Sequence, residues 1–235
     1  MSYCLLIALI LVAVFTAEGV KGNTDYTSFQ LLANWPSSCE FFLELLLAVE
    51  ASWIVLSDIV NGTYRNIIAS GVKRRRYFFS QTGCAAGMST FGLLLATLCY
   101  CELMKNQAGF SAITYKQWLM YSSHLVLIWV RYMAMVVICA SLAFIIKKLY
   151  AVVVSVLVLL FFMLFDGMAI AHPELDWVAK IMNYTPHGGG NVLRDQMLKG
   201  TLSIGSSILN TLPIGVVAII AMVIAVGLFE KTDLN

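Results

Sequence analysis

Long apolar segments with almost no charged residue dominate this sequence, and they limit what it can fold into more than any other feature. Six segments qualify, at residues 3–17, 39–60, 82–104, 119–146, 149–165 and 204–229. A helix of about 20 apolar residues crosses the hydrocarbon core of a bilayer. Only 12% of the chain is charged, whereas about 25% is typical of soluble proteins. The sequence therefore predicts an all-α polytopic membrane protein with six transmembrane helices, formed as one domain over residues 1–235, and it excludes a water-soluble globule.

The few basic residues predict how these segments are oriented. The connection at 61–81 contains the run Lys73-Arg74-Arg75-Arg76, and Lys147 and Lys148 follow the fourth segment. Basic residues near span ends stay on the cytoplasmic side. We therefore expect a multi-pass protein of the bacterial plasma membrane, with this connection and both termini in the cytoplasm. A cleaved signal peptide is the alternative for residues 3–17, but no basic residue precedes that segment, which favours a retained span.

Two isolated charges lie near the middle of predicted spans, Glu50 in the second and Arg131 in the fourth. A charge at this depth costs about 2.5–3.5 kcal/mol on insertion scales, so each needs a partner or a water-filled cavity. We expect Glu50 and Arg131 to pair. The pair would either fix helix packing or act directly in substrate passage or proton coupling; the remaining alternative is that the two charges face separate partners. Glu44 is a candidate lining residue of an outward opening, whereas Glu40, one turn earlier, is expected to snorkel to the interface.

The motifs of several enzyme classes are missing from the sequence. It has no Gly-Lys pair for a nucleotide-binding P-loop, no His-Glu-x-x-His helix and no Gly-x-Ser-x-Gly elbow. Its basic residues are scattered outside one cluster, unlike a nucleic-acid footprint. We therefore expect no catalytic residue, no cofactor, no metal site and no nucleic-acid partner.

The connection at 61–81 is polar enough to leave the membrane and apolar enough to dock against it. Gly62 ends the preceding helix, Thr63 is expected to cap a new one, and Gly71 ends that helix after a small apolar patch. The product is a short helix across the ends of two spans. On physical grounds the basic run that follows either contacts anionic lipid or docks a cytosolic partner.

This connection resembles a hallmark of type-two ABC transporter permeases, especially the small six-span subunits associated with lantibiotic or bacteriocin export and immunity. The matching positions are Gly62, Thr63, Arg65, Asn66, Ile67, Ile68, Gly71, Arg75 or Arg76, Tyr77 and Ser80. The tail from Gly227 to Leu234 resembles the closing Phe-basic-x-Asp signature of the family. One position departs from the pattern, because Val60 stands where an acidic residue is usual.

The resemblance implies that residues 61–72 form a coupling helix, which fits a groove on a separate, cytosolic ATP-binding subunit. It implies a single permease domain that exports a hydrophobic or amphipathic substrate such as an antimicrobial peptide. A second copy of the chain or a related permease would complete the transporter, and the partner subunit would hydrolyse the ATP. An ion-coupled secondary transporter that uses Glu50 and Arg131 is the alternative function.

The resemblance also implies short re-entrant helices between the fifth and sixth spans. Residues 174–203 fit this expectation: the run Thr185-Pro186-His187-Gly188-Gly189-Gly190 reads as a turn, and Asn191 reads as the cap of a second amphipathic helix. Non-helical backbone at membrane depth is tolerated only where it is buried against other spans.

Overall fold

The structure is a computed structural model in which every regular element of the described part is an α-helix. It describes residues 2–20, 27–33, 35, 39–108, 113–171, 174, 176–182, 184–199, 201 and 204–231. The prediction of an all-α protein is therefore confirmed. In chain order the helices are α1 (Ser2–Val20), α2 (Ser28–Ala33), α3 (Glu40–Val60), α4 (Thr63–Ala69), α5 (Arg74–Ala108), α6 (Tyr115–Ile146), α7 (Tyr150–Ala171), α8 (Asp176–Met182), α9 (Pro186–Leu198) and α10 (Ile204–Lys231).

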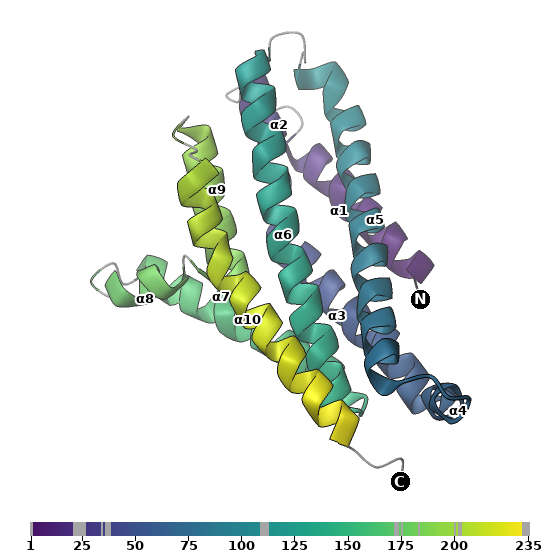
Figure 1. The fold of residues 1–235 in the computed structure, drawn as a ribbon. Helices are drawn as coiled ribbons and strands as arrows, with labels where there is room; N and C mark the ends of the chain where they lie inside the picture. Colours follow the sequence, from purple (N-terminus) through teal and green to yellow (C-terminus); the bar gives the residue numbers. More distant parts are fainter. Residues whose placement is uncertain are drawn as a thin grey trace.

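Helix α6 is the centre of the bundle. It packs against α3, α5, α7, α9 and α10, and Figure 1 shows it running beside α5 along the length of the molecule. A capping box starts it, in which the side chains of Thr114 and Gln117 bond each other's backbone amides. Lys147 ends it in the left-handed region, with φ of 56°. The largest apolar core lies between α1, α3, α5 and α6.

Among the described residues, three helical segments are long and apolar enough to cross a membrane, at Arg74–Lys105, Tyr115–Ile146 and Ser207–Lys231. They support a multi-pass membrane protein, but the structure does not show six spans. The first and fifth predicted segments form shorter apolar helices, Leu6–Gly19 and Tyr150–Leu164. The second segment forms α3, whose 21 residues include four carboxylates. This high charge content distinguishes α3 from the three long apolar helices.

The basic run after α4 is helical, which differs from the predicted loop. Helix α5 begins at Arg74, so only Lys73 of the basic run lies before it. Past Gly71 the sequence contains no helix breaker, and Arg, Phe and Gln all have acceptable helix propensity. Helix α5 therefore begins eight residues before the predicted segment at 82–104.

Two short helices, α8 and α9, lie in the described part of the connection between α7 and α10; that they re-enter the membrane stays a prediction. The predicted turn at 185–190 is wrong, because α9 already starts at Pro186 and Asn191 lies inside it. Thr185 is the cap instead, and its hydroxyl accepts a hydrogen bond from the Gly188 amide at 3.2 Å. A Thr cap followed by Pro at the first helical position is a strong helix start, and it overrides the low helix propensity of the glycines.

Candidate functional site

Helix α4 is short and is flanked by two glycines whose backbone is in the left-handed region. Gly62 before it has φ of 73°, and Gly71 after it has φ of 95°. A side chain in this region costs about 1–2 kcal/mol, and a Cβ at either position would meet no neighbouring atom. The glycines are therefore required by backbone conformation and not by space. They turn the chain sharply on both sides of α4, at the end of the bundle where α10 also terminates (Figure 1).

The two faces of α4 differ in exposure. Tyr64 is buried, and Ile67 and Ile68 are half-buried against the bundle. Arg65 and Asn66 point to the exposed side. The prediction of a short helix with an apolar inner face is confirmed. One detail differs: Gly62 is the N-cap, without a side-chain hydrogen bond, and Thr63 is the first helical residue.

A group of aromatic side chains, the aromatic cluster, connects α4 to three long helices. Its members are Tyr64 of α4, Tyr77 and Phe78 of α5, Phe144 of α6 and Phe229 of α10. The Phe144 ring lies 4.5 Å from that of Phe78 and 5.0 Å from that of Phe229, between ring centroids. The Tyr64 ring is 6.5 Å from Phe229. Through these contacts the aromatic cluster joins α4 to α5, α6 and α10.

Polar contacts around the aromatic cluster also connect α5 to α3. The Asp58 carboxylate of α3 accepts hydrogen bonds from the Tyr77 hydroxyl at 3.1 Å and from Gln81 Nε2 at 2.6 Å. Arg74 Nη1 donates to the carbonyls of Phe229 at 3.4 Å and Glu230 at 3.0 Å. A cation at the carbonyl end of a helix interacts favourably with its dipole. Sequence reasoning did not find the Arg74 contact, because it joins residues far apart in the chain.

Lys147 places a second positive charge at the same point. Its Nζ lies 5.2 Å from the centroid of the Phe229 ring, within cation–π range. Partial burial, together with the nearby Arg74 guanidinium, lowers the pKa of Lys147 below its ordinary value. The remaining basic residues singled out from the sequence, Arg75 and Arg76, are exposed on the first turn of α5. Arg75 stacks over the Phe79 ring at 5.7 Å.

Arg131 is a buried charge whose two terminal nitrogens both have hydrogen-bond acceptors. Its side chain is 1% exposed. Nη1 donates to the Thr185 carbonyl at 2.6 Å, and Nη2 donates to the Asn210 carbonyl at 2.9 Å. Pro213 has no amide hydrogen to donate and disturbs the helical turn before it, which includes Asn210. Arg131 therefore joins α6 to the start of α9 and to the proline-containing turn of α10.

The carboxylates facing Arg131 are Glu40 and Glu44, which lie one turn apart on α3 and interact electrostatically with the guanidinium. The expected snorkelling of Glu40 is wrong, since this side chain is only 2% exposed. A Cβ added to Gly190 would overlap the Glu40 carboxylate, and one added to Gly189 would overlap the Arg131 guanidinium. The glycines of α9 thus let its backbone approach both charges. A carboxylate near a helix start is also favoured by the helix dipole.

The structure does not bring Glu50 and Arg131 together. Glu50 follows Glu40 by ten residues, which is about 15 Å along α3. Since Glu40 and Glu44 already lie beside Arg131, Glu50 lies well towards the α4 end. It lines a separate pocket between α3 and α5, together with Asp58. Of the three predicted intramembrane residues, Glu44 and Arg131 therefore share one site, and Glu50 belongs to another.

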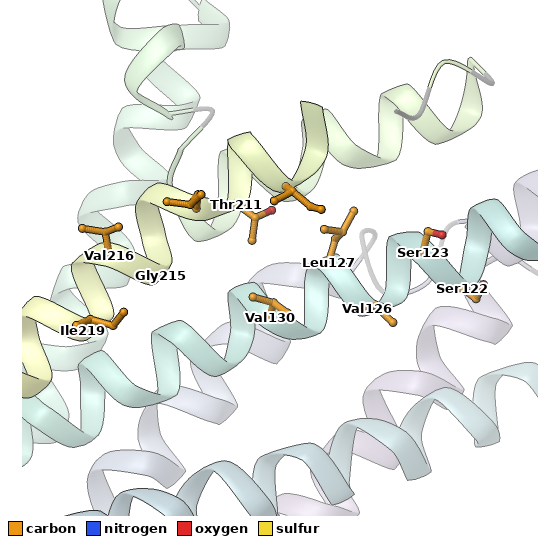
Figure 2. A pocket seen from close by; sticks show the side chains of 11 residues that line it. Ser122, Ser123, Val126, Leu127, Val130, Thr211, Gly215, Val216 and Ile219 are labelled. Atoms are coloured by element: carbon orange, nitrogen blue, oxygen red, sulfur yellow. The ribbon is translucent and has the colours of Figure 1, made fainter. Parts of the chain in front are cut away.

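An apolar groove of about 630 Å³ runs between α6 and α10. Figure 2 shows Ser122 and Ser123 at one end of it, Thr211 on the α10 side, and Ile219 at the opposite end. These three hydroxyls donate to carbonyls of their own helices, which leaves oxygen lone pairs free to accept. In the described part of the chain, no three His, Cys, Asp or Glu residues come together as a metal site.

No known protein family, curated protein or solved structure matches this chain. The comparisons therefore identify no relative of this chain.

Proposed function

We propose that the chain is the membrane-spanning subunit of an ATP-binding cassette transporter, with α4 as the coupling helix for a cytosolic ATP-binding subunit. One observation carries the proposal. Helix α4 presents an exposed polar face while its inner face is fixed to the aromatic cluster. A partner that pushes on Arg65 and Asn66 would act on α10 through the contact of Tyr64 with Phe229, and on α5 and α6 through the other rings of the cluster.

The proposed cargo is a hydrophobic or amphipathic molecule such as an antimicrobial peptide. The α6/α10 groove supports this class, since apolar side chains form most of its wall and hydroxyls lie at one end (Figure 2). An amphipathic molecule would place its apolar part along the groove and a hydrogen-bond donor near Ser122 and Ser123. The complete transporter would contain a second copy of the chain or a related permease.

Reconstitution with a candidate ATP-binding subunit tests the coupling role. The two proteins are co-expressed, purified through a tag on this chain, and assayed in lipid nanodiscs for co-purification and ATPase activity. Arg65→Glu combined with Asn66→Glu should abolish co-purification and stimulated ATP hydrolysis, because both side chains are exposed on α4. The melting temperature of the chain alone should stay unchanged.

Lys148→Glu is the matched control. Lys148 is also basic and exposed, and it adjoins Lys147 of the same end but is not part of α4. A general attraction between basic residues and an acidic partner or anionic lipid would make this variant lose as much binding as the α4 variant. Equal losses, or full binding by the α4 variant, would contradict the coupling role.

A further inference from the structure

The pocket between α3 and α5 is lined by a buried carboxylate, Glu50, that has no hydrogen-bond partner among the described residues. Glu50 is 2% exposed and lines this pocket of about 360 Å³. No hydrogen-bond donor among the described residues reaches either of its carboxylate oxygens. A buried carboxylate without a partner is destabilising, whereas one that binds a cation regains its lost solvation. A positively charged ligand would therefore be stabilised at this position.

The other side chains of the pocket fit an organic cation. Trp53 supplies an aromatic ring within the lining, and Asp58 supplies a second carboxylate two turns further along α3. No Lys or Arg is among the described lining residues. Aromatic rings and carboxylates together recognise ammonium and guanidinium groups. The volume lies at the lower end of the range for small-molecule sites.

Asp58 differs from Glu50 because its carboxylate already has hydrogen-bond partners. Its carboxylate already accepts hydrogen bonds from Tyr77 and Gln81, so it has a structural task at the α4 end. Glu50 has no such task among the described residues, although it is the more deeply buried of the two. Glu50 is therefore the carboxylate of the pocket that is available to accept a hydrogen bond from a ligand.

We propose that the α3/α5 pocket binds an organic ammonium or guanidinium cation through Glu50, with the Trp53 ring as a second contact. The site belongs to this chain alone and does not depend on the proposed ATP-binding partner. If the chain also exports an amphipathic cargo, the cation would be a charged group of that cargo.

Cys84 provides a reporter inside the pocket, since it is exposed and belongs to the lining. The full chain in nanodiscs is treated with N-ethylmaleimide, and modification of the Cys84 peptide is followed by mass spectrometry. Benzylammonium is the probe, and benzyl alcohol is its neutral counterpart of similar shape. For a Kd of ~1 mM, a weak single-site affinity, about 10 mM benzylammonium should slow the modification about tenfold.

Two comparisons decide the result. Benzyl alcohol should leave the rate at Cys84 unchanged, and Glu50→Gln should remove the protection by benzylammonium. Glu102→Gln is the control, because the Glu102 side chain is 74% exposed near the other end of α5, and it should keep full protection. Equal protection by the two probes, protection that survives in Glu50→Gln, or no protection at all would overturn the proposal. The probe comparison needs no variant, so it decides even where Glu50→Gln does not fold.

Discussion

Gly189 of α9 should not tolerate a single added methyl group. A Cβ at this position would overlap the guanidinium of Arg131. That guanidinium is held on both sides, by the Thr185 carbonyl at 2.6 Å and the Asn210 carbonyl at 2.9 Å. Gly189→Ala must therefore move the α9 backbone away or pull Arg131 off its acceptors.

The expected magnitude follows from three opposing terms. Ala in place of Gly favours a helix by about 1 kcal/mol. Overpacking costs about 1–3 kcal/mol, and each lost hydrogen bond to a charged group costs about 1.5–3 kcal/mol. The net loss of stability is about 2–4 kcal/mol. For a chain of this size, that corresponds to a melting temperature lower by roughly 5–15 °C.

Thermal unfolding of the purified protein in detergent measures this effect. Gly83→Ala in α5 is the matched control, because a Cβ there meets no atom within 4 Å. It should keep the melting temperature or raise it. Arg131→Met lowers stability by itself, since it leaves Glu40 and Glu44 without their cation. In that background, however, Gly189→Ala should cost nothing further. If Gly189→Ala behaves like Gly83→Ala in the unaltered chain, the contact between α9 and Arg131 is wrong.

Three further outcomes concern the α4 end of the bundle, and each is measured by thermal unfolding. Gly62→Ala should destabilise the protein by about 1–2 kcal/mol, because it forces a side chain into the left-handed region; an unchanged melting temperature would refute that backbone conformation. Phe229→Ala should cost about 3–5 kcal/mol, since the ring is 3% exposed, whereas Phe91→Ala, with a ring 56% exposed, should cost far less. The pKa of Lys147 is lowered in the folded protein. Below that pKa the charged form of Lys147 therefore reduces the stability of the folded state. This penalty fades as pH rises towards the ordinary pKa of lysine. Lys147→Met should therefore be most stabilising relative to the parent near neutral pH and less so near pH ~10, and an advantage that does not shrink with rising pH would contradict this.

The local parts of the α4 region could be predicted from sequence because single residues determine them. Gly62 and Gly71 both adopt positive φ, and the short helix lies between them as expected. Apolar inner residues and exposed polar ones also follow from helical spacing. The aromatic cluster was harder to foresee, since Phe144 and Phe229 come from helices far along the chain. Its existence depends on tertiary packing that no local pattern contains.

The intramembrane charges show where sequence reasoning failed. Depth was inferred from position within each apolar segment, which placed Glu50 and Arg131 at the same level. The start of α3 instead lies beside Arg131. Glu40 and Glu44 therefore face Arg131, and Glu50 does not. The glycines of α9 were interpreted as a turn, although they serve close approach to Glu40 and Arg131. The relative offset of two helices is set by packing, and a single sequence carries little information about it.

The charge content of α3 also has a consequence for how the protein reaches the membrane. Four carboxylates lie within the 21 residues of α3, and the two away from its ends, Glu44 and Glu50, oppose partitioning of this helix into lipid by itself. The cation that compensates two of the four, Arg131, lies in α6 and is synthesised only after α4 and α5. Glu40 and Glu44 therefore acquire this compensating cation only after α6 has been synthesised. Loss of Arg131 should therefore lower the yield of membrane-integrated protein as well as the stability of the protein that is recovered.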